Sequence, residues 1–427
     1  MKKTFVFIII LVAFMFSGSA FAVARTGDGI PTIVNVGATY QTVTVNGVCR
    51  AIEYLTSAGV VSEIELFNDS AITDYGAVDT VGTYAWAIAQ LPITGGTIRV
   101  HGGTYVFNTG ITVSTINSIK TIGDGKSTVF QQGESLAAGG AMLFWLGSYN
   151  AVFDGIYFLG LGSGTEIALH FLGSPYAIVQ NCYFSTWDGN NTYGCIDLSS
   201  NGYSVIDKSW FNNCGNGSLN PGGWFASAVS ISGSDSSTFG IRITNNEFVG
   251  GSYGVYGEYP ANILIANNHF QQNSGYLANI HILGSYSSTG HLVIVNNIFD
   301  NANQYCVELN TRPSEYGTTD NSIISDNNCT AAGPYSFWVG AGNNISITNN
   351  INNKPIYFAG TGNTGTGNTG SSGVAVLSSG AATVTVPSLC RAVCTDATAA
   401  NPISCTVSGT TLTITGMGMD SINWFCF

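Results

Sequence analysis

The chain carries few charged side chains. Its 12 Lys and Arg and 24 Asp and Glu make up 8% of the 427 residues and give a formal net charge of −12. Binding to nucleic acid through its phosphates requires clustered Lys and Arg, so that function class is excluded. Gly, Asn, Ser and Thr are frequent instead, and they form helices poorly, which excludes a helical bundle. Hydrophobic residues still make up 45% of the chain, enough for a large core.

Short metal-binding and catalytic motifs are also missing. The sequence has no CxxC pair, no Cys and His at zinc-finger spacing, and no ordered calcium loop. It lacks the GxSxG turn of hydrolases and the GxxxxGK[ST] phosphate loop. We therefore expect no metal ion and no cofactor, and catalysis would have to come from side chains that the fold brings together.

The first residues form an export signal. Two lysines precede an apolar run from Phe5 to Phe16, and the small-residue pattern Ala20-Phe21-Ala22 follows. This arrangement predicts a cleaved secretory signal peptide over residues 1–22. No later stretch is apolar enough to span a membrane, so we expect a secreted protein, extracellular or on the cell surface.

In an exported protein, the ten cysteines are candidates for disulfide bonds. Four of them crowd the C-terminal end, and in an oxidising compartment they predict two disulfides that stabilise a small domain. Three connectivities are open for these four residues, Cys390, Cys394, Cys405 and Cys426.

A short block returns along the middle of the chain every 22 to 37 residues. It is an alternating strand that runs into a turn, and a second alternating strand follows each copy. Rungs of this length indicate an all-β fold, a right-handed parallel β-helix in a single solenoid. The copies are FDGIYF, VQNCYF, IDKSWF, ITNNEF, IANNHF, IVNNIF, ISDNNC and ITNNIN, which end at Phe158, Phe184, Phe211, Phe248, Phe270, Phe299, Cys329 and Asn352.

Two positions of the block have structural roles. The recurring Phe is expected to stack inside the solenoid as an aromatic ladder. Three residues before it, Asn recurs where the chain turns, and Asn tolerates the left-handed backbone of a tight corner. Its amide is also expected to bond from rung to rung. The corner residues are Asn181, Asn245, Asn267, Asn296 and Asn349, with Lys208 and Asp326 at the same place in two rungs.

The segment before these coils resembles the opening of the pectate-lyase-like superfamily, which includes secreted polysaccharide-active proteins and phage tailspikes. The resemblance rests on ITDYGAVDTVGTYAWAIAQLPITGGTIRVHGGTYVF (residues 72–107) and TIGDGKSTVF (121–130). It implies a short capping helix near Tyr84–Leu91 and covers about residues 70–360. Lyases, hydrolases, epimerases and non-catalytic adhesins share the superfamily, so it selects no activity. Relatives often carry two Asp before the helix, where this chain has Gly82-Thr83-Tyr84.

We expect five segments in total. The signal is followed by an N-terminal segment and cap (23–110), the coils (111–360), a Gly/Thr/Asn-rich linker (361–373) and a small Cys-rich β domain (374–427). The last segment loosely resembles domains that close phage fibres and other secreted β-helices. It would cap the last rung, whose edge invites aggregation, or assemble the chain, for example as a homotrimer.

The second strand of each rung predicts a strip of side chains on an exposed strand face. Carbohydrate grooves combine aromatic platforms with polar groups that fix sugar hydroxyls. In a chain so poor in charge, acids, imidazoles and aromatics gathered in one column indicate such a groove. The outward column is His170, Asp197, Ser230, Tyr256, His281, Glu308, Trp338 and Tyr357, and its neighbour is Leu172, Ser199, Ser232, Glu258, Leu283 and Asn310.

Two glutamates on this face are candidate catalytic residues. Glu258 and Glu308 lie two rungs apart, roughly 9–10 Å between backbones. Inverting glycosidases hold an acid and a base roughly 6.5–9.5 Å apart. We assign Glu258 as acid and Glu308 as base, with exchangeable roles, and the bland alternative is an ordinary polar face.

A polysaccharide lyase is a further alternative. It would need a basic residue to take the α-proton, and a cation such as Ca²⁺ to neutralise the uronate. Arg312, near several acids, is the only candidate base. The net negative charge would repel polyuronates, so a neutral glycan is the better substrate.

Loops supply two more sugar-binding candidates, Trp187 and Trp224, which would either stack on a sugar at a groove rim or pack against the coil. The sequence thus predicts a β-helix that binds, and in its catalytic form hydrolyses, an extracellular polysaccharide. The alternative is a non-catalytic surface or fibre protein, or an adhesin, that uses the β-helix as a rod.

Overall fold

The structure is a computed structural model, and it describes most of the chain from Thr32 onward. The predicted signal peptide lies outside the described residues. Within them, no helix has the length and apolar character needed to cross a membrane. The described residues are 32–35, 40–137, 140–162, 167–187, 194–215, 227–233, 238–271, 278–283, 291–309, 320–340, 342–354, 356–358, 363–366, 368, 372–376, 381–385, 392–396, 403–409, 411–416 and 421–426.

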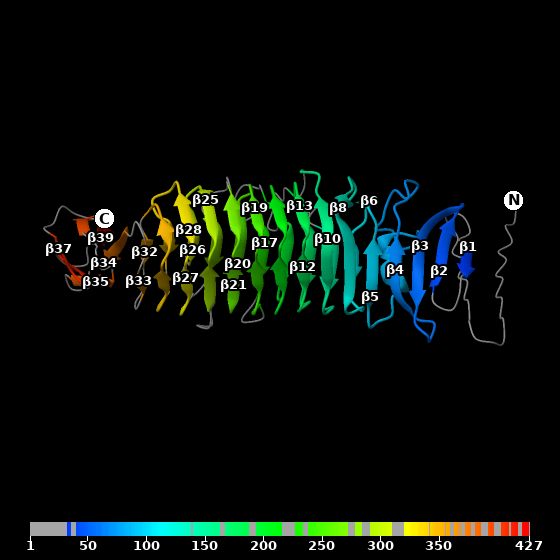
Figure 1. Cartoon of the computed structure of the whole chain (residues 1–427), viewed down its shortest axis with the longest axis horizontal. Coiled ribbons are helices and arrows are strands. Elements are labelled where there is room, and N and C mark those ends of the chain that lie inside the picture. The colour runs from blue at the N-terminus through cyan, green and yellow to red at the C-terminus, as the bar shows by residue number, and fades with distance from the viewer. Residues whose placement is uncertain are drawn as a thin grey trace.

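Short alternating strands pair in parallel from one rung to the next and stack along the long axis of the molecule (Figure 1). The predicted right-handed parallel β-helix is confirmed. Two strand series belong to one sheet and meet at the Asn corner; β8 (Ile119–Gln132) and β10 (Val152–Leu159) run through both. The first series continues with β12 (Ile178–Gln180), β15 (Val205–Asp207), β18 (Arg242–Thr244), β21 (Ile263–Ala266), β24 (Leu292–Val295), β27 (Ile323–Ser325), β30 (Ser346–Thr348) and β33 (Thr364–Thr366). The second has β13 (Tyr183–Ser185), β16 (Trp210–Asn212), β19 (Glu247–Val249), β22 (His269–Gln271), β25 (Ile298–Ala302), β28 (Asn328–Ala331) and β31 (Ile351–Asn352).

The third series forms a sheet of its own, and its outer side carries the predicted strip. Its strands are β7 (Ile111–Val113), β9 (Ala141–Leu146), β11 (Ile167–Leu172), β14 (Ile196–Ser199), β17 (Ser227–Ser232), β20 (Tyr253–Glu258), β23 (Ala278–Leu283), β26 (Tyr305–Leu309), β29 (Phe337–Val339) and β32 (Ile356–Phe358).

The corner residues adopt the predicted left-handed backbone, with φ from 49° at Lys208 to 57° at Asn245 and Asn267. The hydrogen-bonded ladder, however, is formed by the next residue. From Asn268 onward, each ladder Oδ1 accepts bonds of 2.9–3.0 Å from the backbone N–H and the side-chain amide of the ladder Asn in the preceding rung. The Oδ1 of Asn246, the first member, accepts from the Ser209 N–H at 2.8 Å. The expected rung-to-rung bonds of the corner amides occur at Asn181 and Asn245, whose Nδ2 atoms donate to Asp154 Oδ1 at 2.8 Å and to Asp207 Oδ1 at 2.7 Å. The continuous ladder, however, is not formed by the corner residues. The ladder consists of Asn246, Asn268, Asn297, Asn327, Asn350 and Asn368.

The predicted aromatic ladder is confirmed. Its rings are buried and stack face to face with centroids 4.7–4.9 Å apart. The ladder consists of Phe158, Phe184, Phe211, Phe248, Phe270 and Phe299, and Cys329 takes the next place. Disulfides Cys195–Cys214 and Cys306–Cys329 join the third series to neighbouring strands.

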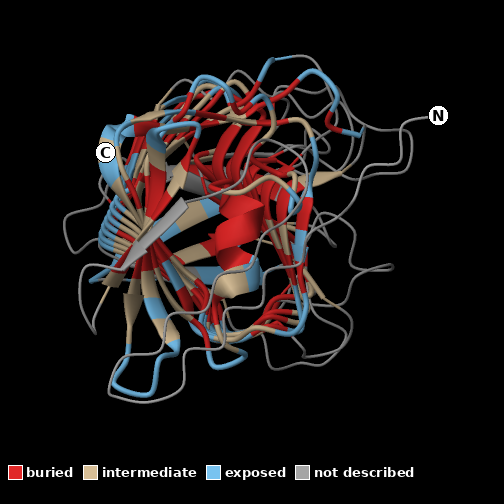
Figure 2. Cartoon of the chain, turned by 90° about the vertical axis from the view of Figure 1, so that its right-hand side faces the viewer, coloured by how far each residue is buried: buried red, intermediate tan, exposed pale blue. Residues whose placement is uncertain are grey.

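The N-terminal end is closed by antiparallel strands and a helix. The strands are β1 (Thr32–Asn35), β2 (Tyr40–Val45), β3 (Val48–Leu55) and β4 (Val61–Leu66), after which β5 (Gly96–Val100) and β6 (Gly103–Phe107) begin the parallel pairing. Helix α1 (Tyr84–Gln90) lies across the interior at this end (Figure 2). Where relatives often have two Asp, Thr83 caps the helix: its Oγ1 accepts a 3.0 Å bond from the Trp86 N–H.

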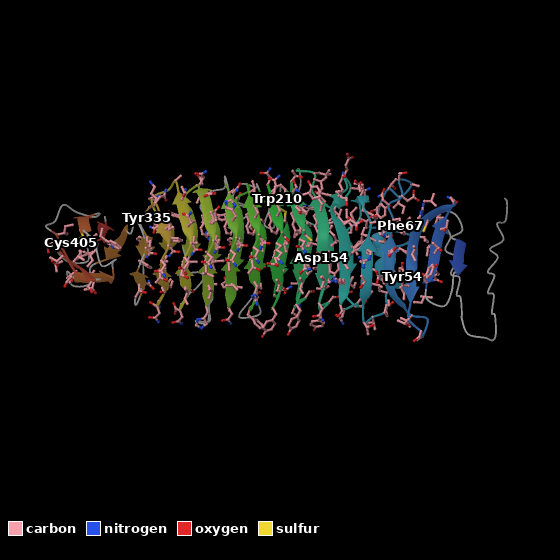
Figure 3. All side chains as sticks on the ribbon, in the orientation of Figure 1. Tyr54, Phe67, Asp154, Trp210, Tyr335 and Cys405 are labelled. Carbon is pink, nitrogen blue, oxygen red and sulfur yellow. A yellow bond between two sulfur atoms is a disulfide. The ribbon has the colours of Figure 1, made fainter. Side chains whose placement is uncertain are left out.

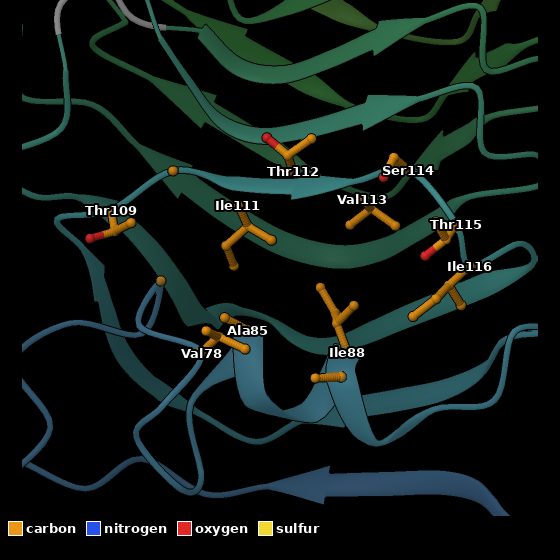
Figure 4. Close-up of a pocket in the computed structure, with 13 residues that line it drawn as sticks. Val78, Ala85, Ile88, Thr109, Ile111, Thr112, Val113, Ser114, Thr115 and Ile116 are labelled. Atoms are coloured by element: carbon orange, nitrogen blue, oxygen red, sulfur yellow. The ribbon is translucent and has the colours of Figure 1, made fainter. Parts of the chain in front are cut away.

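A cavity of about 480 Å³ separates α1 from β7 and the residues after it (Figure 4). Its walls are mostly aliphatic, with Val78 and Ile88 on one side and Ile111, Val113 and Ile116 on the other.

The C-terminal segment continues the third series. Strand β34 (Ser372–Val376) pairs in parallel with β32, and β39 (Ser421–Cys426) and β36 (Ala392–Asp396) add antiparallel strands. A separate antiparallel sheet contains β35 (Ala381–Thr385), β38 (Thr411–Thr415) and β37 (Ser404–Ser408), and Cys394 is bonded to Cys405. The segment predicted as a linker contributes β33, which pairs with β30, so this part extends the coil. Cys390 lies outside the described residues.

Candidate functional site

The register of the third series places the predicted strip residue by residue. Each strip residue is paired with the next, rung after rung, from His170 on β11 to Tyr357 on β32. The neighbouring column, from Leu172 to Leu283, is aligned in the same way. Asn310, its last predicted member, lies outside the described residues.

The middle of the strip is buried, which corrects the expectation of an exposed strand face. Asp197, His281 and Glu308 are 0%, 2% and 3% exposed, and Glu258 in the neighbouring column is 4% exposed. Alternation fixes only the direction of a side chain relative to the coil, not what lies above it. His170 and, at the other end, Trp338 and Tyr357 are half-buried.

Glu258 is held by a tyrosine of its own strand. The Tyr256 hydroxyl donates a 2.5 Å hydrogen bond to Glu258 Oε1. Burial raises the pKa of the Glu258 carboxyl, while the Tyr256 bond and the His281 charge oppose the shift. A carboxyl with a raised pKa retains its proton nearer neutrality, which is what a general acid requires.

Glu308 is held by an imidazole of the rung before it. Its Oε2 lies 2.7 Å from His281 Nδ1. The His281 ring stacks on Tyr256, with centroids 5.5 Å apart and 16° between planes. The two glutamates are therefore connected across three consecutive rungs through Tyr256 and His281.

Two tyrosines flank this pair that the sequence did not indicate. The Tyr253 ring, on β20, lies edge-on to His281 with centroids 5.4 Å apart. Tyr305 is on β26, the strand that also carries Glu308. Burial and the nearby Glu308 charge raise the pKa of both hydroxyls, so both stay protonated as donors. Each begins its strand, and alternation gives no signal for a residue at a strand end.

The backbones of Glu258 and Glu308 are further apart than the simple two-rung estimate. Glu258 and Glu308 are two rungs apart along the axis, roughly 9–10 Å. They also stand in neighbouring columns, two residues apart along the strand direction. Their backbones are therefore further apart than the estimate, and the side chains must lean together to reach the separation of an inverting pair.

A second acid–imidazole pair lies toward the N-terminal end of the strip. His170 Nε2 is 3.0 Å from Asp197 Oδ2, which also accepts a 2.6 Å bond from Ser199 Oγ. Ser199 and Ser232 share a 2.8 Å bond across the rungs. The strip thus repeats one arrangement, a carboxylate beside a histidine of the preceding rung.

The C-terminal end of the strip is aromatic. Trp338 and Tyr357 stack with centroids 4.2 Å apart, and Tyr335 and Tyr305 pack around Trp338. Tyr305, Tyr335 and Trp338 belong to a cluster that is separate from the core of the coil. Because Trp338 directly follows Glu308 in the strip, this half-buried platform adjoins the acidic pair.

The predicted loop residues do not join the site. Trp187 is 1% exposed, and its indole N–H donates to the Phe158 carbonyl at 3.1 Å, so of the two alternatives for this residue packing against the coil is observed and the groove rim is not. The chain turns inward after β13 and places this ring in the core. Trp224 and Arg312 lie outside the described residues. No group of three or more metal-ligating side chains occurs in the part of the chain that the structure describes.

The raised pKa of Glu258 predicts a pH-dependent effect on stability. The folded protein holds this proton more tightly than the unfolded chain, so stability falls as pH rises through the folded-state pKa. Glu258→Gln removes the titration and keeps the shape. Urea unfolding should show parent and variant equally stable near pH 4, and the variant the more stable of the two at pH 7. A difference that does not change with pH contradicts the assignment.

Comparisons with known proteins agree with this architecture. No family model matches the chain, and no curated protein matches its sequence. Among solved structures, the Dettilon tailspike protein is similar with a TM-score of 0.51, 12% identity, and coverage of 85% of this chain and 94% of that one. DFA-IIIase from Arthrobacter chlorophenolicus A6 is similar with a TM-score of 0.48 and 13% identity, and the match covers 73% of this chain and 77% of that one. The Streptococcus pneumoniae adhesin PfbA is similar with a TM-score of 0.46 and 13% identity, and the match covers 71% of this chain and 88% of that one. The right-handed parallel β-helix that the sequence resemblance implied is confirmed; at such identities the likeness shows the fold alone.

Proposed function

On this parallel β-helix, we propose that the chain binds an extracellular polysaccharide and hydrolyses it between Glu258 and Glu308. The observation that carries the proposal is the pair of buried glutamates connected through Tyr256 and His281, one of them with a raised pKa. Perturbed acids gathered in one place are typical of catalytic sites. The net charge of −12 favours a neutral glycan.

The chemistry needs only these side chains and water. Glu258 gives its proton to the glycosidic oxygen as the bond from that oxygen to the anomeric carbon breaks. A water molecule forms the new bond to the anomeric carbon, and its proton passes to Glu308. His281 positions the Glu308 carboxylate, and Tyr256 positions the Glu258 carboxyl.

The sugar chain reaches the acids from the half-buried end of the strip. Trp338 and Tyr357 stack on each other and together form an aromatic surface against which pyranose units pack, and they follow Glu308 on successive rungs. Toward Asp197 the strip is buried. We therefore expect a chain end to enter and short products to be released.

A non-catalytic fibre or surface protein is the second candidate. One observation favours it, since Glu308 is 3% exposed and a polar face can be buried for structural reasons alone. The Cys306–Cys329 disulfide and the ladder stiffen the coil, as a rod requires.

The test incubates the purified protein with xylan, mannan, β-glucan, galactan and a polyuronate. Reducing ends and the ultraviolet absorbance of unsaturated uronates are followed together. We expect new reducing ends on a neutral polymer without any rise in absorbance. A rise in both signals would replace hydrolysis by a lyase reaction, and silence across the panel would favour the fibre protein.

A further inference from the structure

A second strip of side chains follows the outside of the second strand series, on the other sheet. It occupies the position directly before the buried Phe of each repeat, and register pairs each member with the next. We call it the outer aromatic strip (Figure 3 labels Trp210), and it consists of Tyr157, Tyr183, Trp210, Glu247 and His269.

The outer aromatic strip is partly exposed to solvent, whereas the middle of the first strip is buried. All five of its side chains are half-buried, none fully. Its ring centroids are 6.5 Å apart from Tyr157 to Tyr183 and 6.4 Å from Tyr183 to Trp210. The exposed Lys126 places its Nζ 4.5 Å from the Tyr183 ring centre and 5.1 Å from that of Trp210.

Polar groups continue the strip beyond the rings. His269 Nε2 lies 2.8 Å from Asp300 Oδ2, and Gln271 Nε2 lies 3.2 Å from His269 Nδ1. The side chains of His269 and Asp300 remain 33% and 50% exposed. These partly exposed polar groups extend the surface two to three rungs beyond Trp210.

This combination fits a sugar chain better than other ligands. Ring faces accept the C–H face of a pyranose, and the carboxylates, amide and imidazole bond to its hydroxyls. A chain laid along the solenoid passes one rung every ~4.8 Å, close to the length of one hexose in an extended polymer. Glu247 and Asp300, with only Lys126 as a cation at the rings, do not suit nucleic acid.

We propose that the outer aromatic strip is a second polysaccharide-binding surface, separate from the Glu258–Glu308 site, that holds a neutral glycan chain along the solenoid. This proposal rests on the proposed function only in that both take a polysaccharide as the ligand. Holding a polymer at one face would keep its chain ends near the other.

The test is affinity electrophoresis, which measures how far the protein is retarded in gels that contain xylan, mannan, β-glucan or galactan. A gel that contains a polyuronate tests an acidic polymer. Tyr183→Ala and Trp210→Ala each remove one ring and should raise the dissociation constant about fivefold to tenfold on the neutral polymer that retards the parent. Trp210→Phe should retain most of the binding. Circular dichroism melting confirms that each variant is folded.

The chain offers a matched control. Tyr203 is an aromatic residue, 49% exposed, on a different corner of the coil, with φ of 55°. Other rungs carry Asn at this corner, for example Asn150 and Asn262. Tyr203→Asn therefore removes an exposed ring that packs on Tyr176 and Phe239, keeps a residue that tolerates this backbone, and should leave retardation unchanged.

The outcomes separate this proposal from the catalytic one. Glu308→Gln should keep full retardation, because it leaves the outer aromatic strip intact. Loss of binding in Trp210→Ala, in a protein that cleaves nothing, would support the strip and reject hydrolysis. Retardation of Trp210→Ala equal to the parent overturns the strip. So does a dimer or trimer of the parent in sedimentation that Trp210→Ala dissociates, because the face would then be an interface between copies.

Discussion

Glu308→Gln will lower kcat on the accepted polysaccharide by about 10²- to 10⁴-fold, the usual contribution of a positioned acid or base. The amide cannot take the proton of the attacking water, while its size and its contact with His281 are preserved. KM should change little, because the stacking rings at Trp338 and Tyr357 are untouched. Initial rates of reducing-end release measure both constants.

Two further variants make this result specific. Glu134→Gln neutralises an exposed glutamate outside the strip and should leave kcat unchanged. Glu258→Gln should lower kcat on the polymer as much as Glu308→Gln does. On an aryl glycoside, whose leaving group departs without a proton, the loss of kcat in Glu258→Gln should be much smaller. Equal losses of Glu258→Gln on both substrates, or a fully active Glu308→Gln, would reject the acid and base assignment.

Asn297→Ala should be the most destabilising of the single substitutions considered. Asn297 Oδ1 accepts two bonds from Asn268, and its Nδ2 donates to Asn327 Oδ1 and to the Ile265 carbonyl, all in the buried interior. Truncation leaves at least two buried donors without acceptors. We expect a loss of about 3 kcal/mol or more in the free energy of unfolding, measured by urea titration.

The neighbouring corner residue is the control for this substitution. Asn296 is exposed and adopts φ of 55°, so Asn296→Ala should cost only the left-handed backbone penalty of about 1–2 kcal/mol. Glycine at the same position should remove most of that cost. If Asn297→Ala and Asn296→Ala destabilise the protein equally, the buried ladder does not have the stabilising role assigned to it.

Periodicity predicted the parts of the fold that repeat. The Phe of each block stacks inside, and the corner Asn adopt the left-handed backbone, because both roles follow from one residue type at one spacing. The amide ladder was placed one residue too early, since consecutive Asn such as Asn296 and Asn297 look alike in sequence. Only the turn of the corner decides which amide points inward.

The sequence predicted which residues of the candidate site align from rung to rung, but not that they are buried. Alternation was sufficient to align Tyr256, His281 and Glu308 in one column, because parallel pairing fixes the register. Burial of that column depends on what covers the sheet, which strand patterns do not encode. The outer aromatic strip could have been predicted, since Tyr183 and Trp210 directly precede the inward Phe184 and Phe211 and must point outward.

The most direct test of the central claim is the anomeric configuration of the first product, followed by proton NMR during hydrolysis. The two glutamates stand two rungs apart and in neighbouring columns, too far apart at the backbone for the close pair of a retaining enzyme unless both side chains converge fully, so we predict inversion. A product that retains the configuration of the substrate, or one with an unsaturated sugar at its end, would contradict hydrolysis by Glu258 and Glu308 as described.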